Sequence, residues 1–157
     1  MANFSKIRIS GFAKESVVDG PGIRFVIFAQ GCQRGCPDCH NPQTHDLDGG
    51  EEITVDEILA MIDSNPMLDG VTFSGGEPFL QAKEFAELAG YCRNRNLSVV
   101  VYTGFYYEEL LANSNNKDWQ ELLKQTDILI DGPFENEKRT TEFAFRGSSN
   151  QRLLHIK

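Results

Sequence analysis

The sequence has few basic residues, no long apolar run and few cysteines. No apolar run approaches the ~18–20 residues of a membrane-spanning helix, and Met1 to Ile9 lacks the apolar core of a signal peptide. Only 15 Lys and Arg face 23 Asp and Glu, and the net charge of −8 argues against binding nucleic acid through its phosphates. We therefore expect a cytoplasmic protein with neither a membrane nor a nucleic acid as partner.

The length and composition predict one globular domain. A chain of 157 residues can bury roughly two-thirds of its unfolded surface, and we expect a single domain over residues 1–157. The 40% hydrophobic and 24% charged residues are ordinary for such a domain. Three of the four cysteines are close together in the sequence. In a reducing compartment, such a group of cysteines indicates a metal or redox site rather than a disulfide framework.

Strand and helix patterns alternate along the chain. Apolar strand patterns are expected at 7–9, 23–31, 70–74, 97–103, 127–131 and 152–156. Helical patterns are expected at 54–62, 81–93, 106–112 and 118–125. The alternation predicts an α/β fold with a mostly parallel sheet, and five or six strands indicate a partial, open βα barrel. In such sheets the chemistry lies beyond the carboxyl ends of the strands.

Three cysteines lie in one loop directly after the 23–31 strand. Cys32, Cys36 and Cys39 have the spacing C-x3-C-x2-C within "GCQRGCPDCH". Cysteine thiolates are the ligands of iron–sulfur clusters, and a [4Fe–4S] cluster normally takes four. Three thiolates leave one iron open for a substrate or cofactor, as the three protein ligands of catalytic zinc leave one position open.

Two other interpretations of these cysteines remain open. His40 or His45 could complete a zinc site with the three cysteines, although zinc cysteines more often come in separated C-x2-C pairs. Cys92 could supply a fourth thiolate. Its position on the apolar face of the 81–93 helix favours a buried core cysteine.

The cysteine spacing, followed by "SGGEP" after the next strand, resembles the radical S-adenosylmethionine (SAM) superfamily. The resemblance implies a radical SAM partial barrel and a [4Fe–4S] cluster on the three cysteines. It implies that SAM chelates the open iron through its amino and carboxylate groups. It also implies that SAM is cleaved reductively to a 5′-deoxyadenosyl radical, which is chemistry of the cofactor.

The resemblance also assigns cofactor contacts at three strand ends. It implies that Gly75 and Gly76 bind the SAM amino group and that Glu77 adds hydrogen bonds or charge. Taken alone, two adjacent glycines more often form a tight turn. Thr103 in "YTGF" and Asp131 in "ILIDGPF" are further candidates for the SAM pocket, with a loop-ordering carboxylate as the alternative for Asp131.

Three further residues have less certain roles. The position before the third cysteine is usually aromatic or apolar in the superfamily, but here it is Asp38, whose backbone would contact the adenine. His40 would pack near the nucleobase or remain a solvated histidine. Arg24 in "VDGPGIRF" is a partner for a carboxylate or a target polypeptide, or a surface arginine on a strand edge.

The tail "FRGSSNQR" (145–152) closely resembles the carboxyl-terminal segment of activating enzymes of anaerobic, class III ribonucleotide reductase. The resemblance implies a glycyl-radical activase whose protein substrate is the large reductase subunit, with flavodoxin or ferredoxin as electron donor. The alternative is an activase of another glycyl-radical enzyme such as pyruvate formate-lyase, whose activases are usually longer. A non-enzymatic zinc or electron-transfer module is the third interpretation.

Overall fold

The computed structural model describes residues 5–31 and 49–157, and within these residues seven strands form one sheet. The strands are β1 (Lys6–Ser16), β2 (Arg24–Ala29), β3 (Glu51–Thr54), β4 (Gly70–Gly75), β5 (Ser98–Tyr102), β6 (Ile128–Asp131) and β7 (Arg152–His155). The helices are α1 (Val55–Asp63), α2 (Ala82–Arg93), α3 (Tyr107–Ala112) and α4 (Lys117–Gln125), with 3-10 turns η2 (Pro78–Gln81) and η3 (Asn136–Lys138).

The sheet is open and mostly parallel, as the sequence predicts. Its strand order is β3-β1-β2-β4-β5-β6-β7. The neighbours β2, β4, β5 and β6 run parallel, whereas β1 is antiparallel to both β2 and β3, and β7 is antiparallel to β6. Five strands therefore point in one direction. The expected strand count of five or six is wrong because β3 was missed: this edge strand, "EEIT", is exposed or half-buried and carries no strand-like apolar pattern.

The expected helices are confirmed, and their sequences explain where they begin. The Thr54 side chain accepts a hydrogen bond from the Glu57 N–H at 3.1 Å and caps α1. The four apolar positions of its i, i+3, i+4, i+7 pattern are all buried: Val55, Ile58, Leu59 and Ile62. Helix α2 follows η2 directly and likewise buries the apolar face that the sequence predicts.

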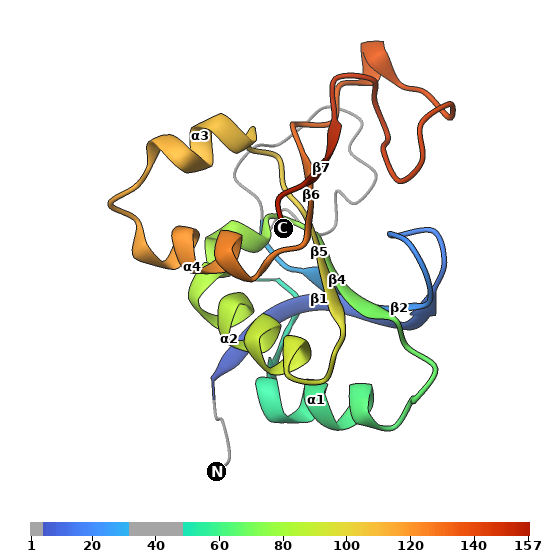
Figure 1. Ribbon diagram of the computed structural model, residues 1–157, viewed down its shortest axis with the longest axis vertical. Coiled ribbons are helices and arrows are strands. Elements are labelled where there is room, and N and C mark those ends of the chain that lie inside the picture. The colour runs from blue at the N-terminus through green and yellow to red at the C-terminus, as the bar shows by residue number, and fades with distance from the viewer. Residues whose placement is uncertain (1–4, 32–48) are drawn as a thin grey trace.

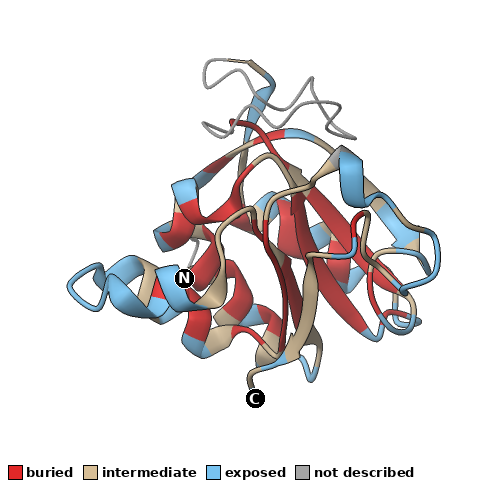
Figure 2. Ribbon diagram, turned by 90° about the horizontal axis from the view of Figure 1, so that it is seen from above, coloured by how far each residue is buried: buried red, intermediate tan, exposed pale blue. Residues whose placement is uncertain are grey.

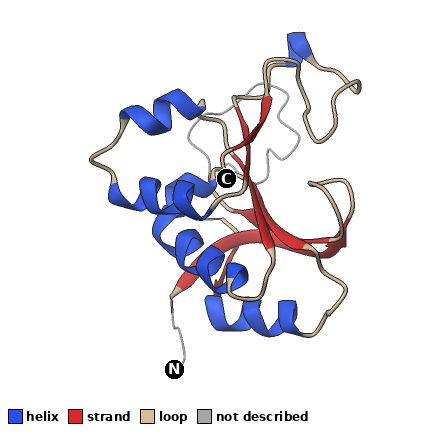
Figure 3. Cartoon of the chain, in the orientation of Figure 1, coloured by secondary structure: helices blue, strands red, loops and turns tan. Residues whose placement is uncertain are grey.

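The helices gather on one side of the sheet (Figures 1 and 3), and the main core lies between the two layers. Phe73 of β4 packs against Phe85 of α2 with ring centroids 4.6 Å apart. Figure 2 shows the buried residues concentrated along the strands and the inner sides of the helices. A smaller apolar cluster centred on Val100, Ile128 and Ile130 is formed apart from this core, and Phe145 of the tail packs against it.

Cys92 is a core residue, which confirms the structural interpretation. Its side chain is fully buried on α2, and burial raises the pKa of the thiol to about 12. The thiol is therefore protonated and unreactive at neutral pH. Among the residues that the structure describes, no helix is long and apolar enough to cross a bilayer.

The interpretation of Arg24 as a surface residue is wrong. Its side chain is only 1% exposed, so it does not face a target polypeptide in this structure. The guanidinium donates to the Thr72 hydroxyl and to the Val71 and Ser98 carbonyls at 2.7–2.8 Å, joining β2, β4 and β5 at their amino-terminal ends. Burial lowers its pKa to about 10, so Arg24 stays protonated at neutral pH.

Candidate active site

The carboxyl ends of the parallel strands bring the expected site residues to one edge of the sheet. Ala29, the last residue of β2, is in register with Gly75, the last residue of β4. Thr103 follows β5 directly, and its N–H donates to the Ile130 carbonyl of β6 at 2.9 Å. Asp131 ends β6. The prediction that these strand ends lie together is therefore confirmed.

The expected cluster ligands Cys32, Cys36 and Cys39, together with Asp38 and His40, lie outside the described residues. The cysteine segment begins immediately after Gly31, at the edge where the other candidates gather. In the described part of the chain, no group of three or more His, Cys, Asp or Glu side chains is placed to hold a metal ion.

The two glycines of "SGGEP" allow the turn after β4 to lie directly against the segment that leads to the cysteines. Gly75 has a φ of +91°, which favours glycine, and a Cβ there would lie 2.6 Å from the Ala29 nitrogen. A Cβ on Gly76 would lie 2.4 Å from the Gly31 oxygen. The Gly76 and Glu77 N–H groups donate to the Ala29 and Gly31 carbonyls, both at 2.8 Å. Contact between this turn and a bound amino group that donates hydrogen bonds would therefore come from carbonyl oxygens.

Glu77 is a buried carboxylate that links the ends of β4 and β5. Only 2% of the residue is exposed. Its carboxylate accepts hydrogen bonds from the Thr103 hydroxyl and the Gly104 N–H, both at 2.7 Å, and from the Phe79 N–H at 3.2 Å. These contacts hold the glycine turn and the "YTGF" segment together, so Glu77 and Thr103 belong to one arrangement. A direct contact of either residue with SAM stays a prediction.

Asp131 is fully buried and pairs with Arg152 of the tail. Its carboxylate accepts from the Arg152 Nε at 3.0 Å, from the Arg152 terminal nitrogen and from the Tyr107 N–H at 2.7 Å. Arg152 also donates to Glu108 at 2.8 Å, and these two carboxylates raise its pKa above the ordinary arginine value. The contacts fit the loop-ordering alternative for Asp131. Sequence reasoning missed Arg152, although it ends the "FRGSSNQR" segment.

The tail itself is ordered by side-chain amides of that segment. Asn150 donates to the Pro133 carbonyl at 2.8 Å and to the Tyr106 hydroxyl at 3.2 Å. Gln151 donates to the Gly132 carbonyl at 3.1 Å and accepts from the Gly147 N–H at 2.8 Å. The tail residues Asn150, Gln151 and Arg152 thus hold the segment that follows β6 against the start of α3.

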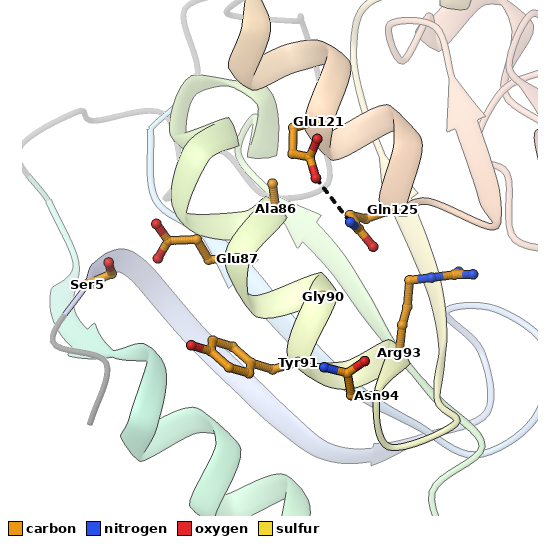
Figure 4. Close-up of a pocket in the computed structure, with 9 residues that line it drawn as sticks. All are labelled: Ser5, Ala86, Glu87, Gly90, Tyr91, Arg93, Asn94, Glu121 and Gln125. Atoms are coloured by element: carbon orange, nitrogen blue, oxygen red, sulfur yellow. Dashed lines mark hydrogen bonds between the residues drawn. The ribbon is translucent and has the colours of Figure 1, made fainter. Parts of the chain in front are cut away.

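A groove of about 700 Å³ lies elsewhere, along α2 and α4 (Figure 4). Glu87 and Tyr91 of α2 and Glu121 of α4 line it, and Glu121 accepts a hydrogen bond from Gln125 at 3.1 Å. Among the residues that the structure describes, none of the predicted site residues lines this groove. The candidate site therefore remains the carboxyl edge of the sheet.

The cysteines of the sequence have the donor chemistry of an iron–sulfur cluster. Three of them lie in the segment that directly follows Gly31 in the sequence, and the Ala29 and Gly31 carbonyls accept backbone hydrogen bonds from the glycine turn. Residues 18–154 match the 4Fe-4S single cluster domain family, and the chain therefore belongs to that family of iron–sulfur proteins.

The chain is similar to activating proteins of two kinds. The chain is 36% identical over 128 residues to the pyruvate formate-lyase-activating enzyme of Clostridium pasteurianum, covering 78% of this chain and 50% of the relative. It is 32% identical over 142 residues to the anaerobic ribonucleoside-triphosphate reductase-activating protein of Enterobacteria phage T4, covering 87% of this chain and 86% of the relative. It is 29% identical over 150 residues to the protein of that name from Salmonella typhi.

The chain thus spans about half the length of the pyruvate formate-lyase-activating enzymes it matches. It covers most of the length of the reductase-activating proteins. These similarities confirm the resemblance to radical SAM activases of glycyl-radical enzymes, for which the cysteine spacing and "SGGEP" indicated the superfamily and the tail "FRGSSNQR" indicated the activases.

Proposed function

We propose that this chain is an activating enzyme for anaerobic ribonucleoside-triphosphate reductase, built as a single radical SAM domain over residues 1–157 with a partial βα barrel. Its protein substrate is the large reductase subunit, and flavodoxin or ferredoxin supplies the electron. When bound, the reduced [4Fe–4S] cluster and SAM supply the radical chemistry that removes a hydrogen atom from one glycine of that substrate.

The observation that carries the choice of partner is the extent of the match to the phage T4 protein. That match covers 87% of this chain, whereas the match to the Clostridium enzyme covers 78%. The wider coverage agrees with the tail resemblance, and the tail is an integral part of the folded unit. Its Arg152 neutralises the buried Asp131 at the carboxyl edge.

The chain's own residues have distinct roles in this proposal. Cys32, Cys36 and Cys39 hold the cluster, and Asp38 and His40 lie near the adenine of SAM. The amino group of SAM, when it binds the open iron, keeps N–H groups that donate hydrogen bonds, so the Gly75 and Gly76 carbonyls, rather than their N–H groups, bind it. Glu77 and Thr103 fix that turn through their 2.7 Å hydrogen bond. Asp131 fixes the end of β6 and the first turn of α3.

The second candidate is an activase of pyruvate formate-lyase. It is favoured by the higher identity of 36% to the Clostridium pasteurianum and Escherichia coli enzymes. Both candidates share the site chemistry and differ only in the protein that supplies the glycine. The cysteines and the glycine turn therefore do not separate them.

The test is activation under anaerobic conditions. Protein reconstituted with iron and sulfide, reduced with dithionite and mixed with SAM should form 5′-deoxyadenosine, and purified class III reductase should develop a glycyl EPR signal. The Cys36→Ala variant should lose both, while Cys92→Ala, which removes a core thiol, should retain them. A glycyl signal in pyruvate formate-lyase but not in the reductase would select the second candidate. No SAM cleavage by iron-loaded wild-type protein would reject both.

A further inference from the structure

The side-chain amide of Gln81 both accepts from and donates to the main chain of β1, as a peptide group of a neighbouring strand would. Its Oε1 accepts from the Arg8 N–H at 2.7 Å, and its Nε2 donates to the Arg8 carbonyl at 2.9 Å. Gln81 is the last residue of η2, which follows the glycine turn directly. The turn of "SGGEPFLQ" is thus attached to β1 as well as to the end of β2.

The same residues hold the chain just before the cysteine segment. The Gln30 N–H donates to the Arg8 carbonyl at 3.0 Å, and the Gln81 Nε2 approaches the Gln30 carbonyl at 3.4 Å. Gln30 lies two residues before Cys32 in the sequence. The Arg8 carbonyl therefore accepts from both Gln30 and Gln81.

The chain just after the cysteine segment is held by the side chain of Arg8. Its guanidinium donates to the Gly49 carbonyl at 3.1 Å and pairs with Glu52 at 2.9 Å. Gly50 has a φ of +74°, and a Cβ there would lie 2.2 Å from the Ile9 oxygen and within 3 Å of Gln30. The described residues on both sides of the cysteine segment, Gln30 before it and Gly49 after it, therefore contact β1.

We propose that Gln81 and Arg8 are positioning residues of the iron–sulfur site. Through main-chain contacts they fix where the segment carrying Cys32, Cys36 and Cys39 leaves the sheet and where it returns. Neither residue touches the cluster in this proposal, which rests on the proposed function. Closing a flexible loop costs conformational entropy, and contacts that already hold its two ends remove that cost from cluster assembly. Groups that orient metal ligands typically change metal affinity by about 10–100-fold when removed.

The first experiment compares two glutamine variants with the same chemical loss. Gln81→Met keeps the side-chain length and removes the amide. Gln120→Met is the matched control, because the Gln120 amide also donates to two backbone carbonyls, at 3.0 and 3.1 Å, but joins α4 to the α3 region. The readouts are the rate of iron loss to a chelator from anaerobically reconstituted protein and the EPR spectrum of the reduced cluster. Gln81→Met should lose iron about 10–100-fold faster and broaden the spectrum. Gln120→Met should match the wild type.

A conservative substitution separates a positioning role from simple filling of space. Gln81→Glu keeps an acceptor for the Arg8 N–H but sets a carboxylate oxygen against the Arg8 and Gln30 carbonyls. It should therefore fail to restore iron retention. Retention equal to the wild type in Gln81→Glu would overturn the proposed hydrogen-bonding role.

Arg8→Met provides a second test if Gln81→Met does not fold. This substitution retains the main-chain contacts of position 8 and removes those to Gly49 and Glu52, while Glu52→Gln removes only the ion-pair charge. Arg8→Met should lose iron several-fold faster than Glu52→Gln. Equal rates in these two variants, or in Gln81→Met and Gln120→Met, would overturn the inference. Absence of iron from the reconstituted wild type would instead reject the proposed function.

Discussion

Gly76→Ala tests the candidate site directly, because its effect on the folded state is steric. Gly76 does not have a positive φ, so alanine suits its backbone conformation. The new Cβ would nevertheless lie 2.4 Å from the Gly31 oxygen and 2.9 Å from the Ala29 oxygen. Ordinary contacts of this kind begin at 3.4 Å, and both obstructing atoms belong to the backbone. The turn and the end of β2 must therefore move apart by about 1 Å.

That separation would break the two hydrogen bonds that join the segments. The Gly76 N–H to Ala29 carbonyl and Glu77 N–H to Gly31 carbonyl bonds are both 2.8 Å long, and an extra 1 Å takes each beyond hydrogen-bonding distance. Each bond is worth about 0.5–1.5 kcal/mol net. The lower backbone entropy of the unfolded alanine chain returns about 0.4–1 kcal/mol. We expect the free energy of unfolding to fall by about 1–2 kcal/mol.

Gly90→Ala is the matched control for this prediction. Gly90 lies inside α2, and a Cβ there would meet nothing within 4 Å. Alanine should therefore stabilise the helix by about 0.5–1 kcal/mol. Urea unfolding of both variants, with iron content after reconstitution, tests the pair. Equal stability and equal iron content in Gly76→Ala and the wild type would refute the close-packing argument for "SGGEP".

Three further predictions concern the fold. Arg24→Met leaves the Val71 and Ser98 carbonyls without the donor that the guanidinium supplies. It should lower the free energy of unfolding, measured by urea unfolding, by about 3–5 kcal/mol. A loss below about 1 kcal/mol would contradict the role of the buried cation. Burial raises the pKa of the Cys92 thiol from 9.0 to about 12. The protonated thiol therefore makes its full contribution to the free energy of unfolding below pH 9, and this contribution is lost as the pH rises toward 12. Cys92→Ala should therefore show a shallower fall in melting temperature between pH 9 and 10.5, and an unchanged slope would reject the buried thiol. Asn96, which follows α2, has a φ of 61°. Asn96→Gly should therefore be neutral or stabilising, whereas Asn96→Ala should destabilise the fold by about 1 kcal/mol. Thermal melting of the two variants tests this prediction.

Sequence patterns predicted the elements whose side chains enter the core. The spacing of apolar residues in α1 and α2 indicated which faces are buried, because only one face of each helix can contact the sheet. The missed strand β3 and the additional length of β1 have mixed exposed and half-buried positions. β3 pairs with the start of β1, where Lys6 is in register with Thr54, and the additional length of β1 pairs with β2, and this backbone pairing leaves no pattern in either segment alone.

The candidate site was predictable only where it lies at strand ends. Glu77, Thr103 and Asp131 each follow an apolar strand pattern, and parallel strands place their carboxyl ends together. Gln81 and Arg8 were not predicted because their contact joins a side chain to a main chain 73 positions away. Arg24 was misjudged for a related reason: a lone arginine usually lies at the surface, and the two strands whose oxygens bind it, β4 and β5, come together with β2 only in the fold.

The two ends of the central strands carry buried charge of opposite sign, and this polarity bears on the choice of ligand. At the amino-terminal end, the Arg24 guanidinium donates hydrogen bonds to oxygen atoms of β4 and β5. At the carboxyl end, the buried groups are the carboxylates of Glu77 and Asp131, which accept hydrogen bonds from the surrounding N–H and O–H groups. SAM bound to the open iron through its amino and carboxylate groups would keep the positive charge of its sulfonium. Asp131 is already paired with Arg152, so the Glu77 carboxylate and the glycine carbonyls are the groups at this edge that would attract such a cation, because opposite charges attract more strongly where water is excluded. This arrangement supports the proposal that SAM binds at the carboxyl end, on grounds that do not depend on the cysteines.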